Sequence, residues 1–143
     1  MKFTEYRRSL NLKKIKKCLI PLENIRCQFN PDYENAWKMV TAGTYSIKSS
    51  PHYQFLEGYE DAYIRMHKLY GRKDLWIVNK VNKFRGLLES IRNDRVKELP
   101  IILDKPIKKN CYNSGFEIYE GHHRLAIAMF LGDSPEVQIC RIG

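Results

Sequence analysis

The chain has 143 residues, 43% of them hydrophobic, and a formal net charge of +9. This length is typical of one domain with a buried core, so the composition argues against global disorder. No hydrophobic run approaches the roughly 20 residues that cross a bilayer, and the basic N-terminus does not resemble a secretory signal.

Cysteine usage and charge narrow the class of protein further. The four cysteines, Cys18, Cys27, Cys111 and Cys140, show no C-x-x-C spacing. In a chain without a secretory signal they predict free, partly buried thiols and a cytoplasmic protein with no membrane partner. The positive charge fits a nucleotide, DNA or RNA as partner, although it also serves solubility.

The first 17 residues are the most basic part of the chain. We expect residues 1–17 to form a basic N-terminal arm and residues 18–143 to form one domain with an insertion at 31–80. Such an arm either contacts phosphate groups or is a solvated terminus, and the sequence alone does not decide. Its basic residues include Arg7, Arg8, Lys13, Lys14, Lys16 and Lys17.

The domain is expected to open with a strand over 18–20, a break at Pro21 and a turn at 30–32. In the insertion we expect a short helix over 33–40 and a loop or weak strand over 43–49. Ser50 and Pro51 predict a helix start, as N-cap and first helical residue.

The second half of the insertion is rich in tyrosine. Tyr59, Tyr63, Met66 and Tyr70 mark one helical face, which ends at Gly71. An aromatic face of this kind is more often core or a pocket wall than a base-stacking surface. Residues 76–78, Trp-Ile-Val, are expected to be buried.

Further elements follow the insertion. Apolar residues at helical spacing predict an amphipathic helix from Lys80 to Asp94, and the apolar run 100–103 predicts a strand. A polar loop over 104–115 carries Lys105, Lys108 and Lys109, and a last strand is expected over 137–140. The order of elements predicts a compact α+β domain with a small mixed sheet.

The stretch from Phe116 to Gly132 carries the strongest functional signal. It predicts a short strand, a glycine turn at Gly121, a helix, and a left-handed C-cap at Gly132.

His122, His123 and Arg124 therefore lie at a helix N-terminus, where unpaired N–H groups and the helix dipole favour an anion. An arginine and two imidazoles at this place predict a phosphate or carboxylate site. The alternative is a helix start whose cationic side chains face water.

Three segments in this order resemble the ParB/sulfiredoxin-like superfamily. Gly121-His122-His123-Arg124, followed by Leu131-Gly132, is similar to the "G-H-H-R … L-G" box of that family. Residues 20–25 resemble its opening strand, and residues 87–103 resemble its helix–strand unit. The resemblance covers 18–30 and 84–142, and it implies a ParB/sulfiredoxin-like fold with a helical insertion.

The branches of the family imply different activities. In sulfiredoxin the box carries a reactive cysteine, and His122 replaces it here, so reductase activity is not implied. In the ParB proteins the box binds the phosphates of CTP, which implies Arg124 as a phosphate contact. Because the chain ends at Gly143, without the DNA-binding domain of that branch, we do not expect a centromere-binding clamp.

The box is most similar to that of the ParB-like free-serine kinases. There the histidines and arginine hold nucleotide phosphates, and a glutamate acts as general base on the substrate hydroxyl. The chain lacks the proline-histidine-glutamate segment of these kinases, so Glu23 and Glu34 are the nearby substitutes. Glu120 adjoins the box, and His122 is a candidate for contacting a second phosphate or a proton in transfer.

We therefore predict a domain that binds the phosphates of ATP, ADP or CTP through Gly121, His122, His123 and Arg124, with hydrolysis or phosphotransfer as its reaction. Mg²⁺ is compatible with this, since it needs few protein ligands. A zinc site is not expected, because adjacent histidines diverge by about 100° on a helix.

Two other hypotheses remain, and a homodimer also stays open. The first is a non-catalytic DNA- or RNA-binding module that uses the basic arm, Lys105, Lys108 and Lys109, and the tyrosines of the insertion. The second is a degenerate fold that acts as a protein-interaction adaptor.

Overall fold

The computed structural model describes residues 11–29, 45–93, 99–104 and 116–142. Within these ranges the strands are β1 (Leu12–Leu19), β2 (Ile25–Cys27), β3 (Tyr45–Ser46), β4 (Ile101–Leu103), β5 (Phe116–Glu120) and β6 (Glu136–Ile142). The helices are α2 (Pro51–Leu56), α3 (Asp61–Leu69), α4 (Asp74–Asn93) and α5 (His122–Leu131), with short 3-10 helices η1 (Leu22–Asn24) and η3 (Ile47–Ser49).

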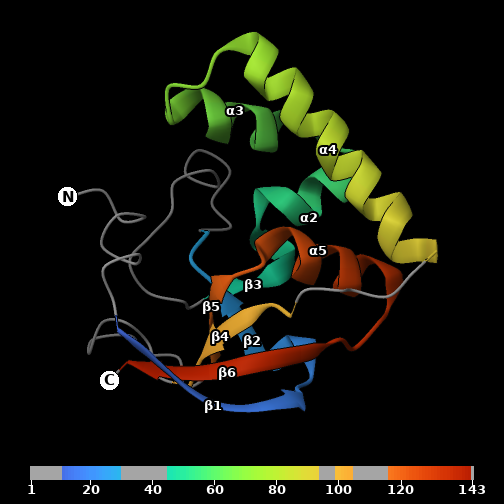
Figure 1. Cartoon of the computed structure of the whole chain (residues 1–143). Coiled ribbons are helices and arrows are strands. Elements are labelled where there is room, and N and C mark those ends of the chain that lie inside the picture. The colour runs from blue at the N-terminus through green and yellow to red at the C-terminus, as the bar shows by residue number, and fades with distance from the viewer. Residues whose placement is uncertain (1–10, 30–44, 94–98, 105–115, 143) are drawn as a thin grey trace.

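The strands form one six-stranded sheet in the order β1-β6-β4-β5-β2-β3. The pairs β2–β5 and β4–β6 are parallel, and the remaining pairs are antiparallel, so the sheet is mixed. The helices gather on one side of the sheet (Figure 1). This arrangement confirms the predicted α+β domain with a small mixed sheet.

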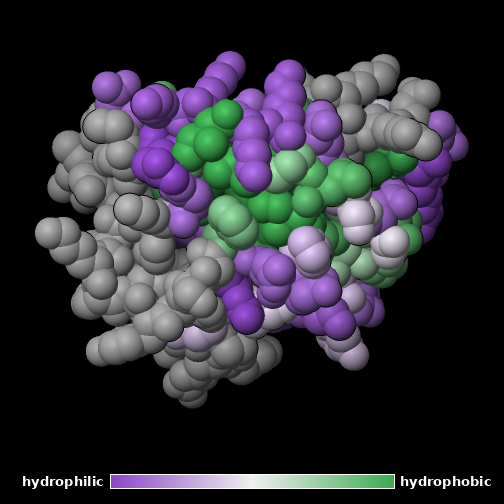
Figure 2. Space-filling model, turned by 90° about the horizontal axis from the view of Figure 1, so that it is seen from below, coloured by the Kyte–Doolittle hydropathy of each residue, from purple (hydrophilic) through white to green (hydrophobic). Residues whose placement is uncertain are grey.

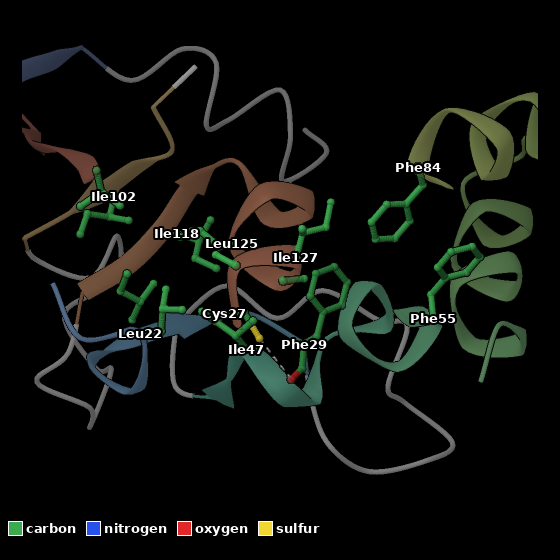
Figure 3. Close-up of a cluster of buried hydrophobic side chains, with 14 of the residues drawn as sticks. Leu22, Cys27, Phe29, Ile47, Phe55, Phe84, Ile102, Ile118, Leu125 and Ile127 are labelled. Carbon is green, nitrogen blue, oxygen red and sulfur yellow. Dashed lines mark hydrogen bonds between the residues drawn. The ribbon is translucent and has the colours of Figure 1, made fainter. Parts of the chain in front are cut away.

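The core lies between the sheet and α5. Leu125, Ala126, Ile127 and Ala128 of α5 are all fully or almost fully buried, together with apolar side chains of β2, β4, β5 and β6. A helix whose buried residues are consecutive is enclosed on several sides, by the sheet below and by helices above. Phe55 of α2 and Phe84 of α4 extend this core, with ring centroids 4.8 Å apart (Figure 3).

The first described strand changes the expected boundary of the N-terminal arm. Residues 12–17 belong to β1, which pairs with β6 over its whole length, although residues 1–17 were expected to form a basic arm outside the domain. The lysines predicted to lie in this arm, Lys13, Lys14, Lys16 and Lys17, are exposed on the edge strand of the sheet. The sequence does not predict this strand from alternating polar and apolar residues, because both faces of the strand carry lysine.

The underside of the molecule in Figure 1 bears a hydrophobic area bordered by hydrophilic side chains (Figure 2). On β1, Ile15 and Leu19 are exposed hydrophobic side chains, and Leu19 also lines a groove with Ile91 and Pro135. This groove is separate from the residues singled out by the sequence.

From Pro51 onward the insertion folds into α2 and α3 and leads into α4, and these helices stand above α5, whereas Tyr45–Ser46 of the insertion form β3 of the sheet (Figure 1). The predicted cap is confirmed: Ser50 Oγ accepts a hydrogen bond from the Tyr53 amide, and Pro51 is the first residue of α2. However, α4 begins at Asp74, six residues before the predicted start at Lys80. Of the three residues expected to be buried there, only Ile77 is, since Trp76 is 38% exposed and Val78 54% exposed.

Several sequence predictions fall outside the described residues. These are the helix over 33–40, the loop over 105–115 and the site residues within them or in the arm: Arg7, Arg8, Glu34, Lys105, Lys108 and Lys109. The cysteines inside the described ranges, Cys18, Cys27 and Cys140, are free thiols, as predicted. In the same ranges no helix combines the length and hydrophobicity that membrane spanning requires.

Candidate functional site

The strand–turn–helix unit predicted from the sequence forms one wall of the candidate site. Strand β5 ends at Glu120, and Gly121 then adopts a left-handed conformation with φ of 107°, from which α5 starts. A Cβ atom on Gly121 would lie 2.8 Å from Pro100 Cβ and 3.0 Å from Pro100 Cα. Glycine is therefore required both by the backbone conformation and by the close approach of the segment before β4.

A cavity of about 550 Å³ opens beside this turn. All four histidines of the chain lie on its wall, although they come from three different helices. Among the described residues, those that line the cavity are Phe29, His52, Met66, His67, Tyr70, Arg72, Trp76, Lys80, Tyr119, Glu120, Gly121, His122 and His123. The volume is within the range of about 300–1,000 Å³ that small-molecule sites usually occupy.

His52 is the centre of the ring cluster behind this wall. Its ring centroid lies 4.4 Å from that of His123 and 5.6 Å from that of His122. It also contacts Phe29 and Tyr63 edge-on, each at 5.5 Å. Its side chain is buried, and its Nδ1 atom has no hydrogen-bond partner among the described residues.

His123 and Tyr63 form a polar pair inside this cluster. Tyr63 is fully buried, and its hydroxyl lies 2.9 Å from His123 Nε2. Burial, together with the positive charge of Lys80, lowers the pKa of His123 to about 3. Burial raises the pKa of the Tyr63 phenol, so both partners are neutral at physiological pH.

This result corrects the expected role of His123. We expected His123, together with Arg124, to neutralise a phosphate, but a histidine with a pKa of about 3 carries no charge at neutral pH. Sequence position places His123 at a helix start, but it does not show that the ring turns into an aromatic cluster. Without a bound anion His123 is therefore a neutral hydrogen-bonding group.

Positive charge at the cavity comes instead from the insertion. Lys80 of α4 lies on the wall, and burial and the nearby Lys83 and Arg72 lower its pKa. Burial, Lys80 and Arg72 together lower the pKa of His67 to about 4. These shifts all favour loss of a proton, as expected where burial is combined with a local excess of positive charge.

A buried hydrogen-bond chain links the sheet to His122. Gln28 and Glu117 are both fully buried. The Gln28 amide nitrogen donates to Glu117 Oε1 at 2.5 Å and to the Ile118 carbonyl at 2.9 Å. Gln28 Oε1 must then be the acceptor for His122 Nε2 at 3.1 Å, so the proton lies on that nitrogen.

Replacing Gln28 is therefore expected to be costly. Gln28→Leu should lower the free energy of unfolding by about 2–4 kcal/mol, because a fully buried carboxylate loses its amide donor. The matched control is Gln138→Leu, a buried glutamine that donates to two backbone carbonyls, with an expected cost of about 1 kcal/mol. Urea denaturation of both variants measures the difference, and equal costs would contradict a special role for the Gln28–Glu117 pair.

The structure brings some of the predicted site residues together. Gly121, His122, His123 and Glu120 all line the cavity. Glu23 is exposed in η1 and is not on its wall. Arg124 does not line the cavity either, although its Nη2 atom lies 3.5 Å from the position that a Cβ on Gly121 would occupy.

Sequence reasoning missed most of the opposite wall. His52 and His67 were not singled out from the sequence, and Lys80 was named only as the expected start of a helix. One signal was available for His67, which follows Tyr63 by four residues and therefore lies on the aromatic face already identified. No local signal marks Gln28, because only the tertiary fold brings it beside Glu117.

Metal binding receives no support from this geometry. Among the described residues, no group of three or more histidine, cysteine, aspartate or glutamate side chains is placed to hold a metal ion. The histidine rings of the cavity pack against one another and against aromatic rings.

Comparison with known proteins assigns no family and no function to the chain. No protein-family model matches the chain, no curated protein matches it, and no solved structure matches its fold.

Proposed function

We propose that the cavity beside Gly121 binds the phosphate groups of a nucleotide, with ATP, ADP and CTP as the candidate ligands. The observation that carries this proposal is the local excess of positive charge on a cavity of about 550 Å³. Lys80 and Arg72 lie on its wall, and both contribute to lowering the pKa of His67. An anion between them would offset this repulsion.

The start of α5 adds a second attraction for phosphate. The first amides of a helix have no partner within the helix, and the dipole places about half a positive charge there. Gly121 has no side chain with which to cap these amides. His122 and His123, whose amides belong to this first turn, are on the cavity wall.

The buried histidines supply an independent indication of a polar ligand. His52 is 4% exposed and His67 is 6% exposed, and both line the cavity. His52 Nδ1 and His67 Nε2 lack hydrogen-bond partners among the described residues. Buried polar atoms are normally hydrogen-bonded, so a ligand with its own donors and acceptors would relieve this cost.

The resemblance to the ParB/sulfiredoxin-like superfamily points to the same ligand class. Glu120 is an exposed carboxylate on the cavity wall, and it is available to a Mg²⁺ ion that accompanies the phosphates. Glu120 and His122 are the candidates for moving a proton if the nucleotide is hydrolysed or its phosphate transferred. Glu23 is not part of this proposal, because it is not on the cavity wall.

The exposed lysines of β1 favour a second function, binding of DNA or RNA. Lys13, Lys14, Lys16 and Lys17 are close together on an edge strand. Phosphate contacts of this kind give binding that weakens steeply with salt. The same lysines also protect a sheet edge from pairing with other chains, so the nucleotide site is the better supported proposal.

Calorimetric titration with ATP, ADP and CTP, with and without Mg²⁺, tests the proposed function. We expect the wild-type protein to bind at least one of them, and Lys80→Ala to weaken this binding by about tenfold or more, because it removes a cation from the cavity wall. Lys83→Ala is the matched control: it removes the same charge one turn further along α4, from an exposed side chain that does not line the cavity.

Arg124→Ala is titrated in the same series. In the described conformation Arg124 is not on the wall, so we expect this variant to weaken binding less than Lys80→Ala. Absence of nucleotide binding, combined with tight and salt-dependent binding of DNA or RNA, would contradict the proposal and support the role of β1.

A further inference from the structure

The helical insertion contributes an aromatic end to the cavity, away from the residues of the box. Tyr70 ends α3, Arg72 lies in the connection to α4, and Trp76 is in the first turn of α4. All three line the cavity. We infer that Trp76, with Arg72 and Tyr70, receives the base of the bound nucleotide and favours a purine.

The indole of Trp76 is the first observation behind this inference. Large aromatic side chains are usually well buried, but Trp76 remains 38% exposed and Tyr70 47% exposed, while both line the cavity. Exposed aromatic surface inside a cavity is available to a planar ligand. Base–aromatic stacking is a strong interaction, and a bicyclic purine covers more of an indole than a pyrimidine does.

Two neighbours hold the indole in one orientation. The Arg72 guanidinium carbon lies 4.5 Å from the centroid of the Trp76 ring, and His67 contacts the indole at 5.0 Å with an interplanar angle of 62°. A ring fixed from two sides loses little conformational freedom when a ligand binds. Because Arg72 lies over one face of the indole, the base is expected on the opposite face.

His67 offers a hydrogen bond at the same place. Its Nε2 atom is buried and has no hydrogen-bond partner among the described residues. Because its ring contacts Trp76, His67 lies next to the proposed position of the base. An apolar ligand would leave this nitrogen unsatisfied, so the His67–Trp76 pair matches a base better than it matches a hydrocarbon group.

The spacing of Trp76 and Lys80 along α4 places the aromatic end of the cavity next to the proposed phosphate site. Trp76 and Lys80 are four residues apart, so they lie on the same face of the helix, about 6 Å apart along its axis. Lys80 is the cation assigned to the phosphates. One cavity therefore presents a stacking surface and a phosphate-binding surface side by side, which is the layout of a nucleotide with its base at Trp76.

The inference rests on the proposed function, and its test separates the two. The probes are ADP, CDP and inorganic pyrophosphate, which shares the two phosphates and has no base. We expect Trp76→Leu to weaken ADP binding by about tenfold or more, to weaken CDP binding less, and to leave pyrophosphate binding within about twofold of the wild type.

Two further variants keep the result interpretable. Val78→Ala, two residues along α4, is exposed and outside the cavity, and it should leave all three affinities unchanged. Trp76→Phe retains a ring and should fall between the wild type and Trp76→Leu. Thermal unfolding of each variant confirms that the fold is intact.

Trp76 fluorescence gives a direct readout. In a Trp37→Phe background Trp76 is the remaining tryptophan, since the chain has two, and we expect ADP to quench it and pyrophosphate to leave it unchanged. If ADP binds equally to the wild type and to Trp76→Leu, the base site is wrong and the phosphate site stands. If Trp76→Leu loses pyrophosphate binding as well, the base site is also wrong, and the titration of Lys80→Ala decides where the phosphates bind. If the wild type binds none of ADP, CDP and pyrophosphate, the proposed function itself fails.

Discussion

Gly121→Ala is expected to lower the free energy of unfolding by about 3–5 kcal/mol. Two costs combine at this position. The backbone has φ of 107°, a conformation that side chains other than glycine resist, and the added methyl group would lie 2.8 Å from Pro100 Cβ. Strained backbone costs about 1–3 kcal/mol, and overpacking costs typically 1–3 kcal/mol more.

Gly132 provides the matched control for this prediction. It also has a positive φ, of 74°, but a Cβ there would meet nothing within 4 Å. Gly132→Ala should therefore cost only the backbone term, about 1 kcal/mol. Urea denaturation of the two variants measures the difference. Equal costs would mean that the segment before β4 shifts freely, and that Pro100 does not fix the start of α5.

The local part of the site could be predicted from the sequence. The strand 116–120, the turn at Gly121 and the helix ending at Gly132 all follow from short-range rules, and the structure has them at the predicted residues. The Ser50-Pro51 helix start was equally readable. These features depend on neighbouring residues alone, so periodicity, capping and glycine positions are sufficient to find them.

The charge and shape of the site could not be predicted in this way. The cationic role expected for His123 was wrong, because the ring is packed against His52, Phe84 and Tyr63, which are distant in the sequence. The burial expected for Trp76 was also wrong. Its apolar character predicts burial, but the bend between α3 and α4 leaves it on a cavity wall.

The chain should lose stability steeply between pH 7 and pH 5. Burial and neighbouring positive charge lower the pKa of His123 to about 3 and that of His67 to about 4, and burial also holds the pKa of His52 well below its usual value. Above about pH 6.5 these histidines are neutral in both the folded and the unfolded chain. Below it the unfolded chain binds protons that the folded chain does not, so the free energy of unfolding decreases as pH falls.

The expected size of this effect is about 1.4 kcal/mol per pH unit for each such histidine, which is about 2 kcal/mol each at pH 5. The loss should level off only near pH 4 for His67 and near pH 3 for His123, where the folded chain binds the proton too.

Urea denaturation at pH 7.5, 6 and 5 measures the slope in a range where carboxylates contribute little. His67→Phe, which keeps a ring beside Trp76, should reduce the slope of the free energy of unfolding against pH by the contribution of one histidine. Lys83→Ala should leave most of this slope intact. A free energy of unfolding that is constant from pH 7.5 to pH 5 would show that the histidines are accessible to protons in the folded chain, and it would remove the buried neutral cluster from the description of the site.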